Sequence, residues 1–347
     1  MIKINKSPAI TTSHYGTNYH TINDDVLSIT TQHYEDVVIK NFDNENCFDI
    51  RTEHDESAKN NLSQEVDDFV ATHTNFKREI LVKKSTKNPI MFEFLPKQNL
   101  VDTITLIVEK DVKAKAIFKY VSNEVISHFL TLKIVLRSGA MLDFAEFFGL
   151  CNSKNFVSVE VVADANSQIN FFVFDTNLSQ SVQNIKVIQN GDGSKANINL
   201  IYFAGKEASV SQNYLIEVFG KNCTANIKAN GVLKDSAQKN FVGTIDFKQG
   251  SKKSVGEEDE ICTLLSKFAR SKSTPVLLCH EEDVDGKHSS VVNRVDDEEL
   301  FYVMSRGMSE NDAKSLLIRA KLSKQVSQIF DEDLKAEVFN HLDEFVK

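Results

Sequence analysis

The chain has 347 residues, enough for one large domain with appendages or for two domains. Its 49 acidic residues outnumber its 40 basic ones and no basic block stands out, which argues against nucleic acid or an anionic membrane as a partner. Residues 1–20 contain no apolar segment typical of a signal peptide, and no later run is apolar enough to span a bilayer. We therefore expect a soluble, cytoplasmic protein.

Residues 1–95 are predicted to form an N-terminal segment of irregular and helical structure. Within it, residues 60–76 have apolar side chains at helical spacing and predict one amphipathic helix. The sequence on either side of this helix is polar and mixed in charge.

Residues 96–295 are filled with short runs of alternating apolar and polar residues, rich in β-branched and aromatic side chains, which predict strands bounded by turns. A strand-turn-strand unit of this length cannot bury its own apolar face, so it stacks on its neighbours. The pattern predicts a mainly β protein with a β-helix (β-solenoid) core, although an antiparallel sandwich has a similar spacing of strands. The repeated apolar positions are Ile117, Leu142, Ile169, Ile198 and Ile227.

Residues 296–347 predict a C-terminal helical domain. Acidic residues after Val295 begin a first helix that Gly307 ends, and Ser309 is an N-cap signal for a second. Asp331 is predicted to cap a last helix with a single apolar stripe, which is either core or interface. A helical cluster of this kind covers the open end of a solenoid, binds a partner, or does both. The stripe consists of Leu334, Val338, Leu342 and Phe345.

Cysteines are few and far apart, so neither a disulfide framework nor a C-x-x-C zinc knuckle is predicted. Their number is odd, and we expect all of them to be reduced thiols. The five residues are Cys47, Cys151, Cys223, Cys262 and Cys279.

The segment CHEEDVDGKH, residues 279–288, is rich in metal-ligating and acid/base side chains. The spacing of His280 and His288 suits neither a helical metal-binding pair nor a short zinc motif. The four carboxylates raise a second possibility, the acid/base pair of a carbohydrate-active β-solenoid enzyme, although the chain has no tryptophan for a sugar-binding groove. From these residues alone, the simplest prediction is a strand over residues 276–283 and a solvated turn at Asp285-Gly286.

Residues 280–320 resemble the C-terminal signature of the SufB/SufD family of iron-sulfur cluster assembly proteins. The resemblance rests on a strand, a turn that ends in His288, an acidic helix start with Leu300-Phe301-Tyr302, and Ser305-Arg306-Gly307 before a capped helix. Ser289 stands where a SufB-type chain has Glu, and the N-terminal cysteine cluster of SufB is absent. The resemblance is therefore closest to SufD.

The resemblance implies a right-handed parallel β-helix and a non-catalytic scaffold subunit of a SufBCD-type complex. It implies pairing with a SufB-type paralogue through the end of the β-helix, docking of a SufC-type ATPase through the C-terminal helices, and a possible homodimer when the chain is isolated. No cofactor is expected to stay bound to the isolated chain. Iron or an iron-sulfur cluster is expected to be held transiently at the interface with the partner subunit.

The same resemblance gives roles to individual residues. His288 matches the family histidine that faces SufB, and it is the predicted ligand of iron or of the nascent cluster. Cys262 and Cys279 are further candidate ligands, although a lone cysteine in a β-core is more often a small apolar residue. The residues predicted to bind partner subunits are Leu334, Val338, Leu342, Phe301 and Arg306.

Overall fold

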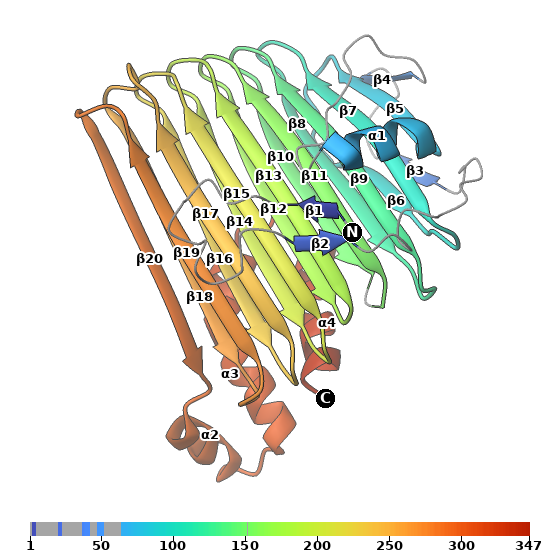
Figure 1. The fold of residues 1–347 in the computed structure, drawn as a ribbon, viewed down its shortest axis with the longest axis vertical. Coiled ribbons are helices and arrows are strands. Elements are labelled where there is room, and N and C mark those ends of the chain that lie inside the picture. Colours follow the sequence, from blue (N-terminus) through green and yellow to red (C-terminus); the bar gives the residue numbers. More distant parts are fainter. Residues whose placement is uncertain (1, 5–19, 23–36, 42–46, 52–63, 151) are drawn as a thin grey trace.

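The structure, a computed structural model, describes residues 2–4, 20–22, 37–41, 47–51, 64–150 and 152–347. These residues form a β-solenoid of about eight turns with four helices, so the predicted mainly β, β-helical fold is confirmed (Figure 1). The strands form two nine-stranded sheets, and the chain alternates between them as it advances. Most neighbouring strands are parallel, which excludes the antiparallel sandwich.

The two sheets are named sheet 1 and sheet 2 and are defined by their strands. Sheet 1 contains β3 (Val37–Asn41), β6 (Ile90–Phe94), β8 (Lys113–Val121), β10 (Met141–Gly149), β12 (Gln168–Asn177), β14 (Lys195–Ala204), β16 (Thr224–Leu233), β18 (Ser254–Leu264) and β20 (Val284–Arg294). Sheet 2 contains β4 (Phe48–Arg51), β5 (Phe76–Val82), β7 (Leu100–Val108), β9 (Ser127–Leu136), β11 (Lys154–Ala163), β13 (Gln180–Gln189), β15 (Ser209–Val218), β17 (Gln238–Phe247) and β19 (Arg270–Cys279). A separate antiparallel pair joins β1 (Ile2–Ile4) to β2 (His20–Ile22).

The two ends of the solenoid differ. The first coil begins at Phe76 rather than at residue 96, because β5 and β6 already pair in parallel with β7 and β8. Beyond them, the short strands β3 and β4 close this end by antiparallel pairing. At the other end, β20 and β19 are the last strands of sheets 1 and 2, and no strand in the described ranges pairs with their outer edges.

The register of the coils corrects part of the predicted repeat. Leu142 pairs with Ile169, and Ile198 pairs with Ile227, as the alignment of repeats expected. Ile169, which the alignment matched with Ile198, pairs instead with Ala196. Ile117, however, pairs with Ala145. It also faces outward, in the cluster beneath the C-terminal helices, rather than toward the interior between the sheets. Both faces of sheet 1 carry apolar side chains at this point, so apolar character alone did not identify the inner face.

The turns from sheet 2 to sheet 1 use residues that tolerate a left-handed backbone. Asn166 (φ 55°) and Asn222 (φ 53°) occupy such positions, and glycine takes over at Gly139 (φ 73°) and Gly193 (φ 69°). Successive turns are also tied to each other, because the backbone N–H of Gly193 donates to the carbonyl of Lys221, 2.7 Å away. This explains how a chain poor in glycine builds regular turns.

Three of the four helices follow the last strand, and their starts agree with the prediction. Asp296, Ser309 and Asp331 each accept a hydrogen bond from a backbone N–H in the first turn of the helix they precede. No helix in the described ranges is long and apolar enough to cross a membrane. The helices are α1 (Gln64–His73), α2 (Asp297–Met304), α3 (Glu310–Val326) and α4 (Glu332–Val346).

Helices cover the outer faces of both sheets. Helix α1 packs Val66, Phe69 and Val70 against Phe129 and Phe156 of sheet 2. Helices α3 and α4 cover the apolar outer face of sheet 1, which is lined by phenylalanines of β10, β12 and β14. Helix α2 instead projects from the corner of the molecule, beyond the end of β20 (Figure 1).

Candidate functional site

The turn between the last two strands lies earlier than predicted. Strand β19 ends at Cys279, the turn occupies residues 280–283, and β20 begins at Val284. Asp285 and Gly286 are therefore strand residues, not the predicted turn. Gly286 faces the interior, where an added Cβ would meet the side chain of Leu277 at 3.3 Å.

The carboxylate of Glu281 stabilises this turn. Its carboxylate accepts hydrogen bonds from the backbone N–H groups of Gly250 and Glu282, both at 3.1 Å, and these bonds lower the pKa of Glu281. The carboxylate therefore organises two adjacent turns. The other acids of the segment, Glu282, Asp283 and Asp285, are exposed.

His288 lies on the last strand of sheet 1 and is exposed. It pairs in register with Glu258 of β18, and register partners on parallel neighbours point to the same face. The Glu258 side chain reaches across the interior to Gly243 of sheet 2, so this face is the inner one. His288 therefore faces the inside of the last coil, at the open end of the solenoid.

A buried polar cluster lies one coil below. Lys239 of sheet 2 and Glu260 of sheet 1 form an ion pair with both side chains fully buried. Tyr202 donates to one oxygen of Glu260 at 3.2 Å, while Ser290 at 3.3 Å and Ser273 donate to the other. The Glu260 charge is thus held by one cation and three hydroxyl groups.

The two candidate cysteines occupy different environments. Cys262 is fully buried in the interior, and burial raises the pKa of its thiol, although nearby Lys239 opposes this. Its register partner on the last strand is Val292, so it does not lie beneath His288. Cys279 is exposed at the end of β19. Within the described ranges, no three His, Cys, Asp or Glu side chains gather in a metal-binding arrangement.

Glu258 is buried without hydrogen-bond partners. Only 1% of the residue is exposed, and neither carboxylate oxygen receives a hydrogen bond. Burial raises the pKa of Glu258 to about 8, and the nearby carboxylates of Glu260 and Asp259 act in the same direction. A buried acid without partners is costly, so its position directly below His288 requires an explanation.

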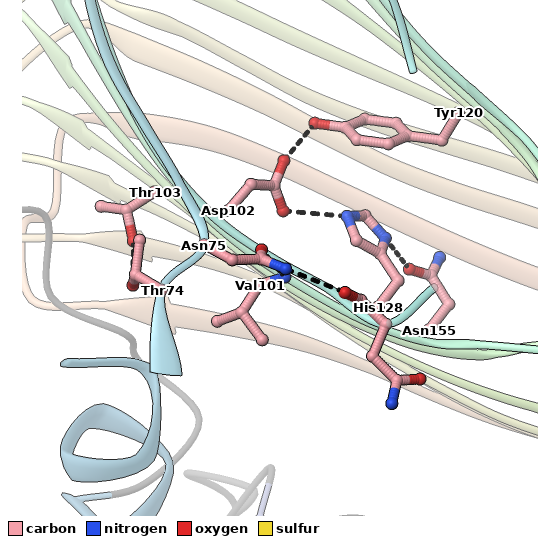
Figure 2. A network of polar contacts seen from close by, with 9 residues as sticks. Thr74, Asn75, Val101, Asp102, Thr103, Tyr120, His128 and Asn155 are labelled. Atoms are coloured by element: carbon pink, nitrogen blue, oxygen red, sulfur yellow. Dashed lines mark hydrogen bonds and ion pairs between the residues drawn. The ribbon is translucent and has the colours of Figure 1, made fainter. Parts of the chain in front are cut away.

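Another polar cluster lies near the closed end of the solenoid (Figure 2). Asp102 lies between Tyr120, whose hydroxyl donates to it at 2.7 Å, and His128, whose Nε2 is 2.9 Å away. The second ring nitrogen of His128 lies 2.8 Å from the side-chain oxygen of Asn155. All four residues are buried, so the cluster ties together three strands of sheet 2 and one of sheet 1.

A third cluster occupies the middle coils. Ser181 and Gln183 donate to one oxygen of Asp175 at 2.6 and 3.0 Å, and Tyr214 donates to Gln183 at 2.6 Å. Burial raises the pKa of Asp175 to about 7, although the Ser181 hydroxyl opposes this shift. Glu146 is also buried, with no partner for either oxygen, and burial raises its pKa well above the usual range. Titratable groups therefore lie along much of the interior.

Comparison with known proteins identifies the family. A family model described as SUF system FeS cluster assembly, SufBD core domain, matches residues 95–321. The chain belongs to the SufB/SufD family. SufD of Bacillus subtilis is 32% identical over 157 residues, which cover 45% of this chain and 36% of that protein. SufD of Escherichia coli is 28% identical over 149 residues, 43% of this chain and 35% of that protein. Both are named SufD, so the predicted likeness to SufD is confirmed, over about a third of each relative.

In this SufB/SufD chain, the residues of α2 that were predicted to bind a partner are exposed. Phe301 is 74% and Tyr302 60% exposed, and no residue of α2 is buried. The Arg306 guanidinium donates to the Tyr302 hydroxyl at 3.0 Å and lies over its ring. Helix α2 thus presents aromatic and cationic side chains to solvent.

The stripe of α4 is placed differently. Leu334, Val338 and Leu342 are almost completely buried, in one cluster with Phe147 and Phe174 on the outer face of sheet 1. That face is apolar and has to be covered, and α4 covers it within the chain. The prediction that these three side chains contact a partner does not fit this packing, which matches the core alternative instead.

The buried polar residues of the open end were not predicted. Residues 256–262 (GEEDEIC) alternate in side-chain direction along β18, so Glu258, Glu260 and Cys262 share the inner face. The equivalent inner positions one coil earlier are Ile227 and Ala229. Acids at inner positions of a repeat that is otherwise apolar were the signal that could have revealed them.

Proposed function

We propose that this chain works as a SufD-type scaffold subunit of a cytoplasmic SufBCD-type complex, with no catalytic step of its own. In this proposal the open end of the β-helix pairs with a SufB-type paralogue, and α2 with its surroundings binds a SufC-type ATPase. His288 supplies a ligand for iron or for a nascent cluster where the two β-helices meet. Without the paralogue, the same end pairs two copies of the chain.

The observation that carries this proposal is the position of His288 on an unpaired edge strand. An edge strand with free backbone groups is a template for pairing with another chain. The imidazole faces the inside of the last coil, so a paired subunit would enclose it. Neutral imidazole is a good iron ligand, and a site divided between two chains opens when the chains move apart.

Helix α2 supports the ATPase part of the proposal. Aromatic and arginine side chains are enriched in protein interfaces and often dominate their binding energy. Phe301, Tyr302 and Arg306 present this chemistry on a helix that contributes no buried residue to its own chain. Helix α2 is followed by α3, which packs together with α4 on the outer face of sheet 1.

Co-purification tests the proposal. The tagged chain is isolated with the subunits that accompany it, and iron and acid-labile sulfide are measured for wild type, His288→Ala and the control His280→Ala. His280 is 59% exposed in the same segment, lies 3.5 Å from Asp246, and is outside the strand that carries His288. We expect both partner subunits in all three preparations, and a loss of iron or sulfide only in His288→Ala.

Two results would contradict the proposal. A chain that purifies alone and without metal would contradict both the scaffold role and the ligand role, and family membership would then indicate only a shared fold. Equal iron and sulfide in wild type and His288→Ala complexes would remove the ligand role while leaving the scaffold role.

A further inference from the structure

The position beneath His288 breaks a regular column of apolar side chains. In sheet 1 the register runs from Phe171 through Ile198 and Ile227 to Glu258, and then to His288. The first three side chains are completely buried, as the core of a solenoid requires. The column changes to a carboxylate and an imidazole only in the last two coils, at the open end.

The solenoid does not need a carboxylate at this position for its own packing. Ile227 fills the equivalent place one coil earlier without any polar group. Glu258 instead buries two oxygens without hydrogen bonds, and such burial costs roughly 1–3 kcal/mol or more. Lys239 does not relieve this cost by pairing, since its ammonium group binds Glu260.

The opposite sheet leaves room for the acid. A Cβ added to Gly243 would lie 2.8 Å from Cγ and 2.9 Å from Oε1 of Glu258, so any larger residue would displace the side chain. Gly243 lies between Tyr214 and Pro275 in register, both residues with bulky rings. The missing side chain at Gly243 gives Glu258 the space to lie inside the coil.

We propose that Glu258 is a second protein ligand for the iron held by His288, and that the two side chains form a carboxylate-imidazole pair on neighbouring strands. This inference rests on the proposed function. Adjacent strands are roughly 4.8 Å apart, a spacing at which two side chains on one face can reach a common ion. Carboxylate oxygen and imidazole nitrogen together suit iron, and water and the partner subunit complete the coordination.

The two side chains have different roles in the proposed iron site. His288 is exposed and meets iron first, while Glu258 lies one coil deeper, releases its proton to solvent and binds the ion as a carboxylate. Iron binding would give the two unpartnered oxygens of Glu258 a cation, which removes the cost of burying them.

Binding of ferrous iron under anaerobic conditions tests the pair. The full chain is used together with the subunits that copurify with it, and the dissociation constant is measured for wild type, His288→Ala and Glu258→Gln. Glu258→Gln keeps the shape of the side chain but cannot become a carboxylate. Glu258→Ile, which copies Ile227, provides a second variant that fits an apolar coil. Glu257→Gln is the matched control, because Glu257 faces outward and pairs with Lys228 at 3.3 Å.

We expect His288→Ala and both Glu258 variants to weaken ferrous iron binding by about tenfold or more, since even residues outside the first ligand shell change metal affinity about 10–100-fold. X-ray absorption of the iron-loaded Glu258→Gln complex should show one oxygen or nitrogen ligand fewer than wild type. Glu257→Gln should bind iron as wild type does.

The outcomes separate this inference from the proposed function. Weak binding in His288→Ala with normal binding in both Glu258 variants overturns the role of Glu258 and leaves the proposed function intact. Normal binding in all variants overturns both. Weak binding in the Glu258 variants alone overturns the pair, because Glu258 would then act without His288.

Discussion

Replacing Asp175 with Asn should remove a large pH dependence from the stability of the fold. Burial raises the pKa of Asp175 to about 7, whereas the unfolded chain has the ordinary value of 3.8. The folded state therefore keeps a proton that the unfolded state releases. Below pH 3.8 both states are protonated, and the contribution to stability is fully present. This contribution to stability is lost as the pH rises through the folded pKa, and well above pH 7 it no longer changes.

The size of the effect follows from the shift. Between pH 5 and pH 7 the unfolded aspartate is ionised and the folded one is mostly neutral, so each pH unit costs about 1.4 kcal/mol. Wild type should lose about 2–3 kcal/mol of unfolding free energy over this range through Asp175 alone. Asp175→Asn does not titrate, so its unfolding free energy relative to wild type should rise by the same amount.

Chemical denaturation of both proteins from pH 5 to pH 8 measures this difference. Ser181→Ala gives a matched second variant, because the Ser181 hydroxyl lowers the pKa of Asp175. Without it the folded pKa should rise further, and the loss of stability should continue to higher pH than in wild type. Parallel pH profiles for wild type and Asp175→Asn would refute the reasoning, since they would mean that Asp175 binds the same number of protons in both states.

Three further substitutions test the C-terminal helices and the buried ion pair. Leu342→Ala should destabilise the chain by about 2–5 kcal/mol, because Leu342 is completely buried on the face of α4 that packs against sheet 1. Phe301→Ala should change stability by no more than about 0.5 kcal/mol and instead reduce recovery of the ATPase in co-purification. If Leu342→Ala reduced ATPase recovery without lowering stability, α4 rather than α2 would be the interface. Lys239→Met should cost about 3–5 kcal/mol by leaving Glu260 unpaired, and adding Glu260→Gln should restore part of it. Thermal unfolding that is unchanged in Lys239→Met would exclude this ion pair as a structural element.

The repeat and the β-solenoid could be predicted because both follow from spacing. A strand-turn-strand period and a two-residue alternation survive substitution of individual residues. The exact register could not be predicted in the same way. Ile117 was placed inside, although it lies under the C-terminal helices, because an apolar residue does not indicate which covered face it belongs to. The first coil was missed because β5 carries the charged run Lys77-Arg78-Glu79.

The candidate site was only partly predictable. His288 could be named from its surroundings in the sequence, but nothing local indicated that Glu258 lies beneath it thirty residues earlier in the chain. Polar residues on a strand, such as His128 and Asp102, ordinarily indicate the solvent face. Here they point inward and satisfy each other. The stripe of α4 could not be assigned to core or interface, because an amphipathic helix does not specify what covers it.

The two ends of the solenoid offer different edges to another subunit. A repeat with two identical open ends would keep adding copies and grow into a fibre. In the described residues, the sheets end in the short antiparallel strands β3 and β4 on one side and in the long parallel strands β19 and β20 on the other. In the pairing proposed above, the edges of β19 and β20 meet the partner subunit, and the short strands of the other end face away from it. A further subunit would then meet a short antiparallel edge, which is a poorer template for another long parallel coil, so the proposed pairing favours two joined β-helices over a fibre.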